Sequence, residues 1–206
     1  MFKDKNLRIV LASGSPRRKE LLGHLNIDFE VIPSDVEEVT DKVIPKEVAI
    51  DLAMLKGNDI FNKVEHGLSK KKQASPLIIA SDTIVVIDQK VLGKPRDREH
   101  AKEMLLSLSG RKHEVYTSIF MKSINSDSQV VERAFCVQTE VEFDIIQDDI
   151  LNLYLDSNDP YDKAGAYGIQ NQGLLFVKEI RGSYSNVVGF PLSDFIREFK
   201  LFVGEL

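Results

Sequence analysis

Residues 11–18, LASGSPRR, stand where a short apolar run gives way to an amphipathic one. The run before them, residues 7–11, predicts a buried strand, and the leucine spacing of residues 19–25 predicts a helix after them. At such a junction the backbone N–H groups and the positive end of the helix dipole are free to hold an anion. Gly14 permits close backbone approach, and Pro16 suits a first helical turn. The stretch is therefore a candidate anion site, although a capped helix with solvated arginines explains the same residues equally well.

The rest of the chain alternates between patterns typical of strands and of helices. β-rich runs predict strands at 28–32, 77–80, 84–87, 113–124, 130–143 and 174–180, and apolar stripes of helical spacing predict helices at 45–64, 97–108, 148–157 and 193–204. This alternation, together with a long hairpin that turns at 125–128, indicates an α/β fold with a mixed sheet. The chain shows no internal repeat and no clear linker, so residues 1–206 are expected to form one domain.

Several local features are also predicted. Ser193 is expected to cap the last helix, residues 182–186 to form a turn, and Leu153 to face the core with Ile150 and Tyr154. The three lysines at 70–72 are expected to lie in an exposed, solvated connection.

The composition is that of an ordinary globular protein, with 43% hydrophobic and 29% charged residues. The net charge of −5 argues against a broad nucleic-acid-binding face, so no stable nucleic-acid partner is expected, but a small polyanion could still bind where basic residues gather. No apolar run approaches the roughly 20 residues of a membrane span, and no signal peptide is evident, so a cytoplasmic protein without a membrane partner is expected. The single cysteine, Cys136, excludes an internal disulfide framework.

Asp82 is the most conspicuous carboxylate in the sequence. It stands in Ser81-Asp82-Thr83 between two β-rich runs, where a lone acid is expensive to bury unless something pairs with it or binds to it. A bulge or strand end at which Asp82 caps backbone groups is the alternative.

Two lysines and one loop carboxylate are further candidates. Lys56 falls on the apolar side of the helix predicted at 45–64, where it either snorkels to water or reaches a ligand. Lys94 is held between a glycine and a proline, so its direction of approach is defined. Glu38 belongs to a loop with three carboxylates, which is either a solvated turn or part of a metal site.

Four stretches together resemble the Maf family of nucleoside triphosphate pyrophosphatases. They are ASGSPRR at 12–18, ASDT at 80–83, LGKP at 92–95 with LSG at 108–110, and DKAGAYGIQ at 162–170. The small residues of the last stretch also forbid a normal helix and suggest a close-fitting binding loop. The resemblance implies a two-lobed α/β fold with an elongated mixed sheet and a cleft between the lobes. It also implies hydrolysis of a nucleoside triphosphate to the monophosphate and pyrophosphate, assisted by a divalent metal such as Mg²⁺ or Mn²⁺.

The resemblance also implies roles for particular residues. The general-base position falls on Asp82, an acidic position falls on Glu38, and the basic phosphate-binding positions fall on Arg17, Arg18, Lys56 and Lys94. The chemistry is consistent, because Mg²⁺ prefers one or two carboxylates together with phosphate oxygens, and arginine grips phosphate bidentately. The hydroxyls of Ser13 and Ser15 add hydrogen bonds at the same helix start. Whether Asp82 is the base, a metal ligand or both is left open.

Three positions indicate the substrate. The branch of the family that resembles dTTP/UTP pyrophosphatases carries an arginine, a threonine and a glutamine where this chain has Arg17, Thr83 and Gln170. The branch that resembles 7-methyl-GTP enzymes has a tryptophan in the first motif, and this chain contains none. An amide at Gln170 offers both a donor and an acceptor to a uracil or thymine base.

Other readings stay open at this point. The alternatives are a 7-methyl-GTP or purine triphosphate pyrophosphatase, or a non-catalytic nucleotide-binding regulator of cell division. The resemblance also suggests a homodimer. Gly57 and Asn171 depart from the residues common in the family, alanine and glycine, and are expected to adjust the local backbone.

Overall fold

The computed structural model describes residues 7–67 and 75–206, so the lysine-rich connection predicted at 70–72 lies outside the described residues. Seven strands form one sheet in the order β2-β1-β3-β5-β6-β7, with β4 also paired to β3. The strands are β1 (Leu7–Leu11), β2 (Glu30–Val31), β3 (Ser75–Ile87), β4 (Lys90–Leu92), β5 (Lys112–Ile124), β6 (Val130–Phe143) and β7 (Val177–Arg181). Strand β1 runs parallel to β2 and β3, and the other pairs are antiparallel. The predicted mixed α/β architecture is confirmed.

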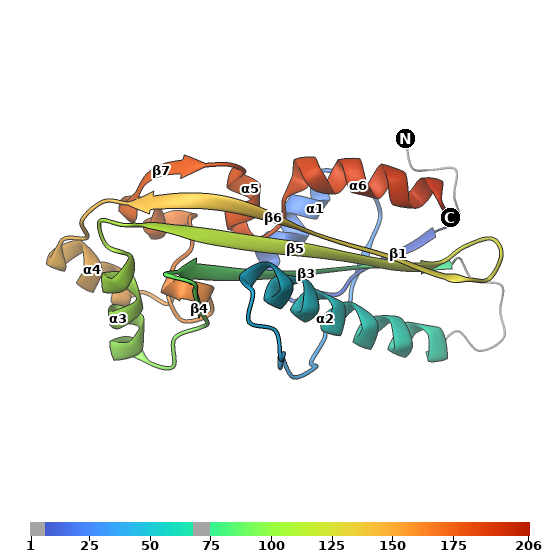
Figure 1. Ribbon diagram of the computed structural model, residues 1–206, viewed down its shortest axis with the longest axis horizontal. Coiled ribbons are helices and arrows are strands. Elements are labelled where there is room, and N and C mark those ends of the chain that lie inside the picture. The colour runs from blue at the N-terminus through green and yellow to red at the C-terminus, as the bar shows by residue number, and fades with distance from the viewer. Residues whose placement is uncertain (1–6, 68–74) are drawn as a thin grey trace.

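Helices pack along this long sheet, most of them toward its two ends (Figure 1). They are α1 (Pro16–Gly23), α2 (Pro45–Gly67), α3 (Arg98–Leu108), α4 (Asp148–Leu155), α5 (Tyr184–Val188) and α6 (Leu192–Gly204), with short 3₁₀ turns at Ala164–Ala166 and Asn171–Phe176. At one end α2 lies on one side of the sheet and α1 and α6 lie on the other, whereas α3 and α4 lie at the far end (Figure 1). Within the described part of the chain, no helix is both long and apolar enough to cross a membrane.

Strand β3 is buried on both faces, because its side chains alternate between two cores. Leu77 and Ile79 pack in the cluster that contains the α6 phenylalanines, and Ile78 and Ala80 pack in the cluster that contains the apolar side of α2. All four are fully buried, and each large apolar side chain contributes about 1.5–3 kcal/mol on burial. The alternation continues along the strand, so Asp82 lies on the face of α2 and the next residue, Thr83, lies on the face of α1.

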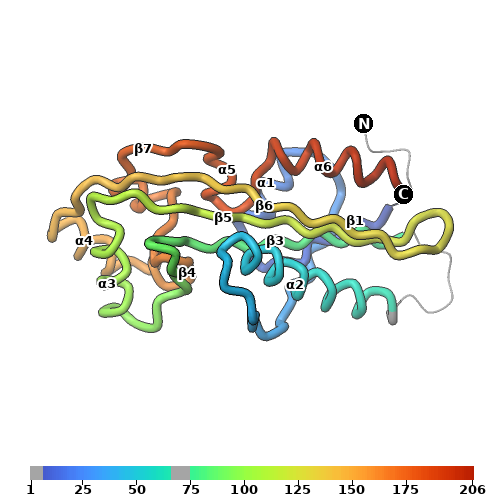
Figure 2. The backbone as a smooth tube through the Cα atoms, viewed as in Figure 1, coloured from blue at the N-terminus to red at the C-terminus, as the bar shows by residue number. Residues whose placement is uncertain are grey.

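One edge of β3 is left without a partner strand in its middle. Strand β5 pairs with the opposite edge without a break from Ile78 to Val86. Strand β1 ends its pairing at Ile79, and β4 begins at Val85, so both must lie on the remaining edge. Figure 2 shows β1 and β4 toward opposite ends of β3. In the described residues no strand pairs with this edge over 80–84, and Asp82 and Thr83 lie in the gap.

The structure corrects two of the expected strands. Strand β3 runs without interruption through Ser81, Asp82 and Thr83, because the pairing with β5 continues through all three. The strand expected at 174–180 begins only at Val177, since a 3₁₀ turn occupies residues 171–176.

The C-terminal third differs from expectation in three further details. The turn expected at 182–186 contains the start of α5, where the N–H of Asn186 donates to the hydroxyl of Ser183. The prediction that Ser193 caps the last helix is wrong, because α6 begins at Leu192 and Pro191 precedes it. Leu153 is 53% exposed, whereas Tyr154 is buried as expected, together with Leu151 and Leu155.

Close packing explains why residue 57 is a glycine here and not the alanine that is common in the family. A Cβ added at Gly57 would lie 2.3 Å from Cδ1 of Phe120 and 3.3 Å from Cβ of Ala80. We expect Gly57→Ala to lower the free energy of unfolding by about 1–3 kcal/mol, because overpacking outweighs the better helix propensity of alanine. Urea denaturation measures this loss. Phe120→Leu is expected to recover part of it, and an equal loss in both backgrounds would contradict the clash.

Candidate functional site

A cleft of about 820 Å³ opens at the unpaired edge of β3. Its volume falls in the range of small-molecule sites. Every residue singled out from the sequence as a site residue lines it: Ser13, Ser15, Arg17, Arg18, Glu38, Lys56, Asp82, Thr83, Lys94 and Gln170. Residues from the start of α1, from α2, from β3 and from the loops around 94 and 170 therefore meet in one place.

Asp82 is held in this cleft by a lysine of α2. The Nζ atom of Lys56 lies 2.5 Å from Oδ1 of Asp82 and 2.9 Å from Oε1 of Glu38. The Asp82 side chain is 7% exposed and that of Lys56 is 13% exposed, so the pair lies largely out of water. Burial raises the pKa of Asp82, although the charges of Lys56 and Arg18 act in the opposite direction. Asp82 is thus a carboxylate that takes up a proton more readily than an exposed aspartate.

The same two carboxylates fit a divalent cation. A single positive group, the Lys56 ammonium, already lies within contact distance of both Asp82 and Glu38. Residues 7–67 and 75–206 contain no preformed group of three metal-ligating side chains. A hard cation with two carboxylates completes its shell with water and phosphate oxygens. The donor set therefore suits a cation that binds together with a phosphorylated ligand.

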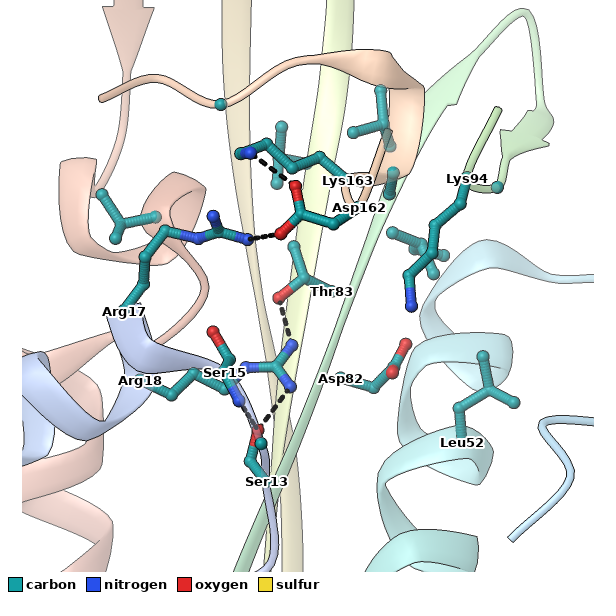
Figure 3. Close-up of a pocket in the computed structure, with 18 of the residues that line it drawn as sticks. Ser13, Ser15, Arg17, Arg18, Leu52, Asp82, Thr83, Lys94, Asp162 and Lys163 are labelled. Carbon is teal, nitrogen blue, oxygen red and sulfur yellow. Dashed lines mark hydrogen bonds and ion pairs between the residues drawn. The ribbon is translucent and has the colours of Figure 1, made fainter. Parts of the chain in front are cut away.

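The start of α1 forms a wall that faces these carboxylates. The backbone N–H of Ser15 donates to Oγ of Ser13 at 3.3 Å, and the Ser15 hydroxyl caps no N–H of the helix. Lys94 reaches in from the opposite side, and its ammonium points toward Asp82 (Figure 3). Among the described residues Lys94 makes no ion pair, so its charge is available to an anion.

The two arginines of α1 point in different directions (Figure 3). Arg18 turns inward and donates to the carbonyl of Gly189 at 3.1 Å, to Oγ of Ser13 at 3.2 Å and to Oγ1 of Thr83 at 3.0 Å. Burial lowers the pKa of this guanidinium, and the charge of Asp82 opposes the shift. Arg18 therefore fastens the α1 wall to β3 and α5, in addition to any phosphate contact that its remaining N–H groups make.

Arg17 crosses the cleft toward two residues that the sequence did not single out. Its Nη2 lies 3.7 Å from Oδ2 of Asp162, whose Oδ1 accepts from Nζ of Lys163 at 2.6 Å. Burial raises the pKa of Asp162, but the hydrogen bond from Lys163 and the nearby positive charges outweigh this and leave it lowered. The motif at 162–170 was recognised by its glycines. Its first two residues, Asp162 and Lys163, follow no periodic pattern, so nothing in the sequence identified them as site residues.

The cleft also has an apolar lining. Aliphatic side chains from α2, β3, β4, β5 and α5 contribute to it, and Tyr167, Ile169 and Gln170 line the cleft from the late loop. The aliphatic residues include Leu52, Ile84, Val85, Val91, Leu92, Val115 and Val187. A flat ring can bury its faces there, and Gln170 provides an amide that can both donate and accept.

A buried carboxylate paired with a lysine, a helix start rich in hydroxyls, and an apolar recess beside them define a cleft for a phosphorylated, ring-bearing ligand. Residues 8–202 match the sequence model of the family described as Maf-like protein. The chain belongs to this family, as the four motifs indicated.

Named relatives cover nearly the whole chain. A protein of Carboxydothermus hydrogenoformans named dTTP/UTP pyrophosphatase is 44% identical over 194 residues, which are 94% of this chain and 98% of that protein. A protein of Fusobacterium nucleatum with the same name is 40% identical over 192 residues, 93% of this chain and 94% of its own. A solved structure of a HAM1 protein from Coxiella burnetii aligns with a TM-score of 0.47 and 14% identity, over 97% of this chain and 100% of that chain.

Proposed function

We propose that this protein hydrolyses dTTP and UTP to the nucleoside monophosphate and pyrophosphate. The proposal rests above all on Asp82, a buried carboxylate paired with Lys56 in a cleft that also presents phosphate-binding groups. The names of the relatives support it. We also propose that it acts in the cytoplasm, because nucleoside triphosphates are present there.

In the proposed reaction a water oxygen forms a bond to the α-phosphorus, and the bond from that phosphorus to the bridging α–β oxygen breaks. Asp82 accepts the proton of the attacking water, and pyrophosphate leaves. Lys56 and Lys94 stabilise the charge that develops on the phosphate oxygens, and Ser13 and Ser15 hold the phosphate chain at the start of α1. A divalent cation held by Asp82 and Glu38 would supply charge neutralisation and a lower pKa for a bound water.

The base is proposed to lie in the apolar recess with Gln170 against its polar edge. Arg17 and Thr83 line the same cleft and are proposed to contribute to the choice of base. Gln170 is half-buried, whereas Gln172 is exposed and does not line the cleft. The two glutamines therefore provide a matched pair of variants.

A panel of UTP, dTTP, CTP, ITP and 7-methyl-GTP with detection of pyrophosphate tests the proposal. The wild-type protein is expected to favour UTP and dTTP. Gln170→Glu is expected to lower kcat/KM for UTP about tenfold, because one hydrogen bond to the base is lost, and Gln172→Glu is expected to change nothing.

Other outcomes of this panel would point elsewhere. Faster release from 7-methyl-GTP or ITP would assign the protein to one of the alternative substrates. Nucleotide binding without release of pyrophosphate from any substrate, with Mg²⁺ or Mn²⁺ present, would favour the non-catalytic regulator. An unchanged substrate ranking in Gln170→Glu would refute base reading by Gln170.

A further inference from the structure

A buried threonine on β5 determines the direction of a hydrogen bond in the cleft. Thr117 pairs directly across the strands with Thr83, and the two Oγ1 atoms lie 3.0 Å apart. The Thr117 hydroxyl also lies 2.7 Å from the backbone carbonyl oxygen of Asn186. A carbonyl oxygen can only accept, so the single proton of Thr117 goes to Asn186. The hydrogen bond between the threonines must therefore be donated by Thr83.

Thr83 can therefore only accept a hydrogen bond from a ligand and cannot donate one. Its proton points to Thr117, and one of its lone pairs accepts from Nη2 of Arg18 at 3.0 Å. A hydroxyl has one proton and two lone pairs, so a single lone pair remains for a ligand. Thr83 lines the cleft, whereas Thr117 and Asn186 do not.

The acceptor at the end of this chain is fixed in place. Asn186 is fully buried, and its Nδ2 donates to the carbonyl of Val115 at 3.1 Å and to Oγ1 of Thr139 at 3.0 Å. Gly189, with φ +117°, brings α5 close to the pair, and a Cβ there would lie 3.2 Å from Oγ1 of Thr83. Because Asn186 is held from two sides, its carbonyl continues to take the proton of Thr117.

We propose that Thr117 is a positioning residue that makes Thr83 an obligate acceptor, and so favours uracil and thymine over cytosine. This inference rests on the proposed function. Uracil and thymine carry an N–H at N3, which can donate to the free lone pair of Thr83. The N3 of cytosine is itself an acceptor, so two lone pairs would face each other. Thr117 thus contributes to substrate choice without touching the substrate.

Thr117→Val tests the inference, because valine has nearly the shape of threonine but cannot take the proton of Thr83. Thr83 is then free to donate into the cleft. We expect the ratio of kcat/KM for UTP to that for CTP to fall about tenfold, the value of one hydrogen bond, mainly through a lower KM for CTP. Thr117→Ser keeps the hydroxyl and is expected to keep the wild-type ratio.

Measurements in a second genetic background, Thr83→Val, separate an effect transmitted through the Thr83 hydroxyl from a general loss of structure. Both substrates are measured on the same folded protein, so a lower melting temperature of Thr117→Val does not alter the ratio. In a Thr83→Val background, Thr117→Ser and Thr117→Val are expected to give the same ratio, because the hydroxyl through which Thr117 acts is absent.

The outcomes separate a failure of the role inferred for Thr117 from a failure of the proposed dTTP/UTP hydrolysis. A wild-type ratio in Thr117→Val overturns the inference, and so does a ratio in the Thr83→Val background that still depends on residue 117. Failure of the wild-type protein to release pyrophosphate from UTP or dTTP overturns the proposed function and the inference together. If Thr117→Val does not fold, the same ratio is measured in Thr117→Ala, which also lacks the hydroxyl: a lower ratio supports the inference, and the wild-type ratio overturns it.

Discussion

Asp82→Asn is expected to lower kcat for UTP by about 10²–10⁴-fold, the usual contribution of a general base, while the melting temperature holds or rises. Asparagine keeps the shape of the side chain and still accepts from Lys56, which lies 2.5 Å away, but it cannot take a proton from water. Pyrophosphate release and thermal unfolding of the same preparation measure the two effects. Near-normal turnover in a folded variant would exclude the proposed role.

The stability part of this expectation follows from the sign of the pKa shift. Burial raises the pKa of Asp82 in the folded protein, so the folded state binds the proton more tightly than the unfolded chain does. The contribution of Asp82 to stability is therefore most favourable at low pH, and it declines as pH rises from the unfolded pKa through the folded pKa. At neutral pH the ionised form of Asp82 therefore stabilises the fold less than the protonated form does, and asparagine resembles the protonated form.

The same shift predicts the acid limb of the pH profile. A base must be unprotonated to act, so kcat/KM should fall as pH drops through the raised pKa of Asp82, above the ordinary value of about 4 for aspartate. Asp59 offers a matched control, since it also pairs with a lysine of α2, Lys63, but does not line the cleft. Asp59→Asn should retain both the turnover and the acid limb.

Lys94→Met is expected to lower kcat by about 10²–10³-fold, as the loss of one donor to a transition-state oxyanion does in other enzymes. The loop that bears Lys94 is anchored, because the N–H of Gly165 donates to the carbonyl of Gly93 at 3.0 Å. The charge of Lys94 is exposed and makes no ion pair among the described residues. The substitution should therefore leave the melting temperature unchanged.

Lys90 provides the control for this variant. It lies on β4, four residues before Lys94, and does not line the cleft. Lys90→Met should retain wild-type kinetics with UTP. If Lys90→Met and Lys94→Met lowered kcat equally, the effect would be one of overall charge, and the proposed contact of Lys94 with the phosphates would be wrong.

The sequence predicted those parts of the fold and site that local physics determines. The strand that ends at Leu11 and the helix that begins at Pro16 follow from apolar runs and a proline at a first turn, and both are confirmed. Asp82 was identified because an isolated acid among apolar residues must be compensated, and the structure places Lys56 beside it. Local rules of this kind need only neighbouring residues.

What could not be predicted depends on contacts between distant segments. Strand β3 continues through Ser81 and Thr83 because β5 pairs with it there, and the two hydroxyls find partners at Gly189 and Thr117. Asp162 attracts notice only once Arg17 is seen across the cleft from it. Thr117 looks like any polar strand residue until its proton is traced to Asn186.

The gap along β3 has a consequence for association between molecules. An unpaired strand edge is a template to which another chain can add by backbone hydrogen bonding, and natural proteins deter this with charge. At this edge the deterrent is the set of charged groups around Asp82, Lys56 and Arg18, which line the cleft and are proposed to hold a triphosphate. An apolar peptide strand that docked there would bury the exposed charge of Lys94 as well, without a partner for it. The charges proposed for catalysis thus also protect the fold against edge-to-edge aggregation.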